Sequence, residues 1–328
     1  MKRGKTIMTK NGLITLGEAL IDFIPVDATN ITYQKSPGGA PANVAVGAAR
    51  LGMKSAFIGK LGQDVLGEFL IETLTNYGVD VSSVAQTADY RTGLVFVTLD
   101  QTGERSFSFF VKESADLFLE STEVNEIPFK NHKIFHFGTI SMLQNPVKQS
   151  TLTAIQFAKK HGMIVSFDPN VRLSLWKDEK QLRDTIFSVL PDVDVFKLSD
   201  EELAFLTGEA DTAIIEDWIK TYNLKLVFLT KGAEGSIVFT KTGSVEVSAL
   251  KVKTVDTTGA GDAFVSGFLY QLNQRQADLA DLTLDEAREI AKFASVSGGL
   301  AASEKGAMTA LPTLSAVNKI MTGNGSIE

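Results

Sequence analysis

From about residue 130 onward, apolar stretches rich in β-branched and aromatic residues alternate with stretches of helical periodicity. Four of the apolar stretches predict buried strands, at residues 134–138, 163–167, 194–198 and 226–230. Helices are predicted between and after them, at residues 149–160, 180–190, 201–206, 213–221, 260–272 and 284–302. Strands that alternate with helices pair in parallel, and the helices cover both faces of the sheet. The pattern therefore predicts an α/β fold around one largely parallel sheet.

The region before residue 115 departs from this alternation. Its segments are a β-like stretch at 13–24, helices at 41–51 and 66–77, and a hairpin pattern at 93–99 and 106–111 around a turn at 100–104. We expect strands at about 13–35 and 90–112 to form a small β-sheet lid over one end of the large sheet. An extension of the large sheet explains the pattern equally well. The chain is expected to form a single domain over residues 12–315, with tails at 1–11 and 316–328.

The composition limits the class of protein. The 328 residues carry a net charge of −7, and such an acidic chain offers no basic field to a nucleic acid or an anionic membrane. Cysteine is absent, and there are only three histidines in the sequence, which is too few to favour a multi-histidine metal centre. One of them, His136, lies in an apolar run. No stretch is long and apolar enough to span a bilayer, and the basic N-terminus lacks the unbroken apolar core of a signal peptide. We therefore expect a cytoplasmic protein.

The run from Asp256 to Phe264 reads Asp-Thr-Thr-Gly-Ala-Gly-Asp-Ala-Phe and starts an apolar helix. Backbone N–H groups at a helix start have no intrahelical partner, and the helix dipole adds positive potential there. Gly259 and Gly261 lack the Cβ atoms that would keep a phosphate or an oxyanion away from those donors. Asp262, in the first turn, could then accept a proton from a hydroxyl beside the phosphate. The run predicts a phosphoryl-transfer site, although helix capping and tight packing also explain it.

A second glycine-rich run, Gly-Gly-Ala-Pro-Ala-Asn, starts another helix. Gly38 and Gly39 could offer N–H groups to a polyol, and Asn43 supplies both a donor and an acceptor. Upstream, Glu18 and Asp22 are four residues apart and are expected to face the same side of one strand. Sugar hydroxyls would satisfy the Asp22 carboxylate as donors, and solvent at an edge strand would satisfy it equally well.

Further polar residues follow the predicted strands, and ligands bind at the carboxyl ends of parallel strands. Ser199 and Glu202 have the spacing of a capping box. A second interpretation has Glu202 holding Mg²⁺ through water, with Lys197 near a phosphate. Arg172 follows another strand and could bind a phosphate, and the turn at residues 230–235 follows a third strand. We expect all of these residues to gather at one edge of the sheet.

Two common nucleotide-binding motifs are missing from the chain. It contains no G-x-x-x-x-G-K-S/T run, so it is not a P-loop NTPase. Phe264 stands where the last glycine of a G-x-G-x-x-G motif would be, which weakens an interpretation as a Rossmann dehydrogenase.

The two glycine-rich runs, in this order and at this separation, resemble the two signatures of the ribokinase-like (PfkB) sugar kinases. The resemblance extends over about residues 12–315 and is strongest to the fructokinase members of the family. Further matching segments lie at residues 17–22, 166–172, 198–203 and 305–312. The resemblance implies a central, mostly parallel sheet with a small β-sheet lid, and ATP-dependent phosphorylation of a sugar primary hydroxyl. For fructose, this hydroxyl is the one on C6.

The resemblance also implies roles for individual residues. The base would be Asp262, and the anion hole for the transferring phosphoryl group would be formed by the amides of Gly259, Ala260 and Gly261. Besides Asp262, the sugar would be held by Asp22, Gly38, Gly39, Asn43 and Arg172. Besides Gly259 and Gly261, the nucleotide would contact Lys197, Ser199, Thr230, Lys231, Gly232, Gly235 and Ser295. Mg²⁺ would be held by Glu202, and an activating K⁺ by Asp256, Thr258, Ala301, Glu304 and Gly306.

Departures from the family patterns bear on the substrate. Ala40 and Pro41 stand where ribokinases carry Lys and Gly, which disfavours ribose, and Ser199 replaces the Asn of ribokinases, as is common in fructokinase-like members. Lys112 stands where many fructokinases carry an arginine after two aromatic residues. The alternatives to a fructokinase are a 2-keto-3-deoxygluconate kinase, a riboside kinase, or a non-catalytic sugar or nucleotide sensor. The expected partners are a sugar and ATP, together with a second copy of the chain if the lid also forms a dimer interface.

Overall fold

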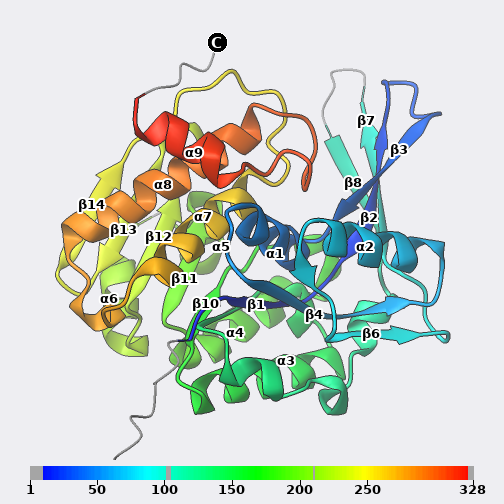
Figure 1. The fold of residues 1–328 in the computed structure, drawn as a ribbon, viewed down its shortest axis with the longest axis horizontal. Helices are drawn as coiled ribbons and strands as arrows, with labels where there is room; N and C mark the ends of the chain where they lie inside the picture. Colours follow the sequence, from blue (N-terminus) through cyan, green and yellow to red (C-terminus); the bar gives the residue numbers. More distant parts are fainter. Residues whose placement is uncertain (1–9, 101–104, 210, 324–328) are drawn as a thin grey trace, which may run out of the picture.

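The computed structural model describes residues 10–100, 105–209 and 211–323, and it confirms the α/β fold (Figure 1). The large sheet has ten strands. Their order is β14 (Gly243–Val247), β13 (Ser236–Thr240), β12 (Leu226–Thr230), β11 (Val195–Ser199), β10 (Ile164–Phe167), β9 (Ile134–Phe137), β1 (Leu13–Leu16), β4 (Ser55–Gly62) and β5 (Val79–Asp80), with β6 (Val84–Thr87) also paired to β4. The pairs from β12 to β5 are parallel, while β13 and β14 are added antiparallel at one edge.

Helices cover both faces of the large sheet, as Figure 1 shows. One face packs against α3 (Val147–Lys160), α4 (Glu179–Val189), α5 (Asp200–Thr207) and α6 (Ala213–Tyr222) in a single buried cluster. The opposite face packs against α1 (Ala40–Arg50), α7 (Ala260–Gln274) and α8 (Leu284–Ala302). Because the strands are covered on both faces, they are apolar along most of their length, and this is why the sequence pattern was informative.

A separate four-stranded sheet forms beside one end of the large sheet. Its order is β3 (Tyr33–Gly38), β2 (Leu20–Pro25), β7 (Leu94–Leu99) and β8 (Arg105–Phe110). The hairpin of β7 and β8 is antiparallel, as its sequence pattern predicts, and the residues 101–104 of its predicted turn lie outside the described residues. Helix α2 (Val65–Asn76) packs against the root of this sheet through Leu70 and Leu74. This sheet is the expected lid.

The prediction of one β-like segment over residues 13–24 is wrong in its details. Leu13–Leu16 is β1, in the middle of the large sheet, and the lid begins only at Leu20 with β2. The chain bends between them at Gly17, where a Cβ atom would lie 2.5 Å from Cγ of Pro41. Glu18 lies in this bend and not on a strand with Asp22, so the prediction that the two carboxylates face the same side of one strand is wrong.

The predicted tail at residues 316–328 is also partly wrong. Residues Leu314–Met321 form α9, which buries Val317 against Phe293 and Val296 of α8. The amphipathic pattern of this helix is short, and its apolar face gains stability from a cluster formed with α8 and Leu51. Residues 1–9 of the predicted N-terminal tail and residues 324–328 lie outside the described residues. Among the helices that are described, none combines the length and the apolar character needed to cross a membrane.

A row of stacked aromatic rings crosses neighbouring strands of the large sheet, and it provides a test of the core. Phe137 is fully buried, with ring centroids 5.7 Å from Phe135 and 4.8 Å from Phe167. Replacing Phe137→Ala would leave a cavity in a rigid sheet, so we expect the free energy of unfolding in urea to fall by about 3–5 kcal/mol. The control Ile31→Ala, at a side chain that is 81% exposed, should change it by less than about 0.5 kcal/mol. A loss below about 1 kcal/mol for Phe137→Ala would contradict this account of the core.

Candidate active site

The start of α7 has the open geometry that its glycines predict. Gly259 caps the helix in the left-handed region with φ 77°, and a Cβ there would lie 3.2 Å from Cα of Ala307. At Gly261, the nearest atom to an added Cβ would be Nζ of Lys197 at 4.0 Å, so the space beside its Cα is open. The Ala260 amide donates to the Thr257 carbonyl at 3.1 Å. The amides of Gly259 and Gly261 are therefore better placed to bind an anion than that of Ala260.

Asp262 lies in the first turn of α7, and its carboxylate faces the start of α1. Its Oδ2 accepts a hydrogen bond of 2.8 Å from Nδ2 of Asn43. Burial raises the pKa of Asp262 to about 6, while the Asn43 hydrogen bond and the positive charges of Lys197 and Arg172 limit this rise. Asp262 is therefore mostly ionised at pH 7 but basic enough to accept a proton, as a general base must be.

Asp22 occupies a position that requires glycine opposite it. A Cβ on Gly38 would lie 2.3 Å from Oδ2 of Asp22, so any larger residue would displace the carboxylate. Burial raises the pKa of Asp22 to about 6, and Arg172 opposes this rise. Gly39 has φ 103°, and a Cβ there would lie 2.5 Å from the Glu18 carbonyl oxygen. The predicted sugar-binding residues Asp22, Gly38 and Gly39 are thus in close contact.

Glu18 is a buried acid for which the sequence reasoning gave no role. Its Oε1 accepts the Ala40 amide at 3.0 Å, which ties the bend before β2 to the start of α1. Burial raises the pKa of Glu18 to about 8, and the nearby carboxylates of Asp116 and Asp262 contribute to the rise. Glu18 is therefore protonated at pH 7. A carboxylate in an otherwise apolar run was the only sequence signal for this residue.

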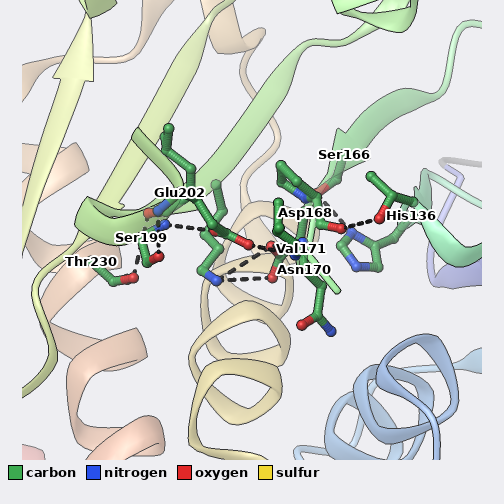
Figure 2. A network of polar contacts seen from close by, with 12 residues as sticks. His136, Ser166, Asp168, Asn170, Val171, Ser199, Glu202 and Thr230 are labelled. Atoms are coloured by element: carbon green, nitrogen blue, oxygen red, sulfur yellow. Dashed lines mark hydrogen bonds and ion pairs between the residues drawn. The ribbon is translucent and has the colours of Figure 1, made fainter. Parts of the chain in front are cut away.

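A buried ion pair joins the ends of β10 and β11. Nζ of Lys197 lies 3.0 Å from Oδ2 of Asp168, and the amide of Asn170 donates to Oδ1 of the same carboxylate at 3.1 Å. Figure 2 shows the polar network around Asp168 and Asn170. Burial disfavours the charge on Lys197, but Asp168 and Glu202 more than compensate, so the pKa of Lys197 is raised. A permanent positive charge therefore lies beside Gly261. The role of Asp168 in holding Lys197 was not predicted.

Glu202 forms the capping box that its spacing predicts. Its Oε2 accepts the Ser199 amide at 2.8 Å, and Oγ of Ser199 accepts the Glu202 amide at 3.1 Å. The other oxygen, Oε1, accepts the Val171 amide at 2.8 Å, as Figure 2 shows. Burial raises the pKa of Glu202, while Lys197 opposes the rise. Because each oxygen already accepts an amide, the remaining lone pairs suit a hydrogen bond from metal-bound water better than direct coordination.

The remaining nucleotide candidates lie along β11, β12 and α8. Thr230 pairs with Ser199 across the two strands, and its Oγ1 donates to the Leu198 carbonyl at 3.4 Å. In the turn that follows, Lys231 forms an ion pair with Glu234, and Gly232 and Gly235 have positive φ. Ser295 lies one turn before Gly298 on α8, and Gly298 contacts the start of α7. The structure thus brings Ser199, Thr230 and the turn together, whereas Ser295 approaches from a separate helix.

The five candidate potassium ligands lie in two segments, Asp256 and Thr258 before α7, and Ala301, Glu304 and Gly306 at the end of α8 and in the turn after it. Asp256 accepts the amides of Thr258 at 3.0 Å and Gly306 at 3.2 Å through its two oxygens. The amides of Val255 and Asp256 donate to the Ala302 carbonyl, which holds the second segment against the first. In the described part of the chain, no group of three or more His, Asp or Glu side chains is placed to hold a metal ion.

Arg172 lies at the opening of the site. Its Nη1 donates to the Val171 carbonyl at 3.0 Å, and its side chain is exposed. Its charge lowers the pKa of both Asp22 and Asp262, so the guanidinium acts on the two carboxylates at once. An ionised carboxylate, a glycine-rich helix start and two cations are groups that could together support transfer of a phosphoryl group to a hydroxyl.

Comparison with known proteins places the chain in a family. It matches the pfkB family carbohydrate kinase model over residues 10–314, and it belongs to this family. It is 43% identical, over 94% of its own length and 82% of the relative's, to "Probable fructokinase-6, chloroplastic" of Arabidopsis thaliana. This confirms the sequence-based resemblance.

Solved structures agree with this assignment. Fructokinase from Xylella fastidiosa with bound ATP superposes with a TM-score of 0.91 at 34% identity, covering 97% of this chain and 100% of the other. A double mutant of fructokinase from Vibrio cholerae O395, with fructose, ADP and potassium ion bound, has a TM-score of 0.85 at 40% identity, covering 94% and 98% of the two chains. The chain therefore has the ribokinase-like fold over nearly its full length.

The ion pair of Lys197 and Asp168 can be tested by denaturation. Asp168→Asn leaves a buried ammonium without its main partner, so we expect the free energy of unfolding at pH 7 to fall by about 3 kcal/mol. The control Asp184→Asn removes an exposed pair with Lys180 and should cost less than about 1 kcal/mol. If the two substitutions lowered the free energy of unfolding in urea equally, the buried pair would contribute no more to stability than the exposed pair.

Proposed function

We propose that the protein is an ATP-dependent fructokinase that transfers the γ-phosphoryl group of ATP to the C6 hydroxyl of D-fructose. The observation that carries this proposal is the Asp262 carboxylate, ionised and held at the glycine-rich start of α7. The relatives supply the substrate, because several proteins and solved structures similar to the chain are named fructokinases.

Each residue would contribute by position or charge. Asp262 would accept the proton of the C6 hydroxyl as its oxygen attacks the phosphorus in line with the leaving ADP. The amides of Gly259 and Gly261, with Ala260 between them, and the ammonium of Lys197 would stabilise the charge on the transferring group. Asp22, Gly38, Gly39, Asn43 and Arg172 would hold the sugar hydroxyls. Nucleotide contacts would come from Ser199, Thr230, Lys231, Gly232, Gly235 and Ser295.

Two metal ions have candidate sites in this arrangement. Glu202 suits Mg²⁺ through bound water, since both of its oxygens accept amides, and Mg²⁺ would neutralise the charge on the ATP phosphates. K⁺ would be held between the segment before α7 and the end of α8 with the turn after it, by Asp256, Thr258, Ala301, Glu304 and Gly306. Ala307, which follows Gly306, lies next to Gly259 at the start of α7. A cation bound at these residues would therefore help to fix the position of the anion hole.

The lid offers a surface for a second copy of the chain. Phe23 and Phe96 stack with ring centroids 5.0 Å apart, and Tyr33 and Phe110 pack on Phe96 at 5.3 and 5.7 Å. Phe110 is 60% exposed. Such an aromatic face on a four-stranded sheet supports a homodimer through the lid, which sedimentation of the wild type and Phe110→Ser would test.

A cytoplasmic location remains a prediction; the Arabidopsis relative is named chloroplastic.

The function is tested by ADP release with MgATP and a panel of acceptors. The panel contains fructose, ribose, 2-keto-3-deoxygluconate, glucose and a purine riboside, each with and without K⁺. We expect the highest kcat/KM on fructose and stimulation by K⁺. A preference for another acceptor would retain the kinase mechanism and reject the fructokinase assignment. Binding of sugar and ATP without turnover would favour a sensor.

The role of Asp262 is tested by Asp262→Asn. This change removes the proton acceptor with little change in volume, so we expect kcat to fall by about 10³-fold or more. Affinities for fructose and ATP, measured by calorimetry, should stay within a few-fold of wild type. The matched control is Asp285→Asn, since Asp285 also lies in the first turn of a helix but is exposed. Turnover near that of wild type in Asp262→Asn would reject the assigned base.

A further inference from the structure

Helices α1 and α7 lie side by side on the same face of the large sheet (Figure 1). They are in contact at Gly47. A Cβ built on Gly47 would lie 2.4 Å from Oγ and 2.7 Å from Cβ of Ser266. Contacts this short do not occur in proteins, so a larger residue would force the helices apart. Gly47 and Ser266 are both buried. The absence of a side chain at Gly47 therefore sets the distance between the two helices.

The contact between Gly47 and Ser266 is in register with the hydrogen bond between Asn43 and Asp262. Asn43 lies four residues before Gly47, and Asp262 lies four residues before Ser266. Residues four apart lie on the same helix face, so the two contacts are stacked one turn apart. Asn43 is buried, its Nδ2 donates to Asp262 at 2.8 Å, and its Oδ1 has no hydrogen-bond partner in the described structure. The reach of this amide to Asp262 thus depends on how closely the helices approach.

We propose that Gly47 and Asn43 are positioning residues for the base: the close contact at Gly47 holds α1 near enough to α7 for the Asn43 amide to orient the Asp262 carboxylate and to stabilise its negative charge. The inference rests on the proposed function, because it takes Asp262 as the base. It adds a residue that touches neither the sugar site nor the nucleotide site, and it gives Asn43 a role besides contact with the sugar.

Other charged groups also act on Asp262, and all of them lie on elements other than α1. They are Glu18 and Asp22 from the segment that enters the lid, Asp168 and Arg172 after β10, and Lys197 on β11. Burial raises the pKa of Asp262, and the Asn43 hydrogen bond opposes the rise. Of these five groups, Glu18 accepts the amide of Ala40 at the start of α1, so a displacement of α1 can also move Glu18. A shift in the titration of Asp262 in a Gly47 variant, with the titration of Glu18 unchanged, would therefore report the loss of the Asn43 contact.

The first variant is Gly47→Ala, assayed with fructose and MgATP from pH 5 to 9. We expect the acid limb of the kcat profile to move up by about one pH unit, since a hydrogen bond to a charged group is lost. We also expect kcat at pH 7 to fall about tenfold because the base is less well oriented, with the KM for fructose within about threefold of wild type. A raised KM with an unchanged acid limb would overturn the proposal.

The rescue variant is Gly47→Ala combined with Ser266→Gly, which exchanges the two side-chain volumes across the same contact. The helices can then approach again, so the acid limb should return to within about 0.3 pH unit of wild type. The control for stability is Asn273→Ala, a buried residue of α7 whose hydrogen bonds go to Gly12 and Asn11. It should lower the melting temperature without moving the acid limb. A shift of the limb in Asn273→Ala would show that loss of stability alone explains the effect.

A measurement without turnover separates this inference from the proposed function. The carboxyl carbon of Asp262 is titrated by ¹³C NMR in the substrate-free protein and assigned with Asp262→Asn. We expect the pKa to increase from wild type to Gly47→Ala and further to Asn43→Asp, in which two adjacent carboxylates must share a proton. Lack of activity on fructose in the wild type would reject the fructokinase assignment, whereas equal pKa values in the three proteins would reject the positioning role.

Discussion

Burial of negative charge at the carboxyl edge of the large sheet is the constraint on which the site depends. Five carboxyl groups gather there, from Glu18, Asp22, Asp168, Glu202 and Asp262, and the positive charges of Lys197 and Arg172, from the described part of the chain, oppose the rise in pKa of several of them. A buried carboxylate is costly unless it is paired, hydrogen-bonded or protonated, and the protein uses all three solutions. Glu18 is protonated, Asp168 is paired with Lys197, and Glu202 accepts two backbone amides. Asp22 and Asp262 have pKa values near 6, which leaves both able to exchange protons with a ligand.

The sequence was sufficient to predict the fold where each strand is buried on both faces. The strands from β9 to β12 and the helices between them appear within a few residues of their predicted positions, because an uninterrupted apolar run has few other solutions. The same reasoning misplaced residues 13–24, since a continuous apolar pattern contains no sign that its two halves belong to different sheets. The break is made by Gly17 against Pro41, a contact between residues distant in sequence. The helix α9 was missed for a similar reason, because its stability comes from α8.

The site could be predicted to the extent that its residues lie in the two glycine-rich runs. Asp22, Gly38, Gly39 and Asp262 were expected to meet, and the structure places them together. What the sequence could not show was the pairing among side chains. Asn43 was predicted as a sugar ligand but donates to Asp262, and Lys197 was predicted near phosphate without its partner Asp168. These pairings depend on distances between elements far apart in the chain, and residue types alone carry no information about such distances.

The direct passage of the chain from β1 into β2 has a mechanical consequence. Asp22 belongs to the lid sheet, whereas Asp262 belongs to a helix packed on the large sheet, and only the short bend around Gly17 joins the two sheets at this point. A rotation of the lid about that bend would carry Asp22 with it and leave Asp262 in place. The two carboxylates that would hold and activate the same sugar thus belong to separate layers of the fold, and any change in the angle of the lid would change the distance between them.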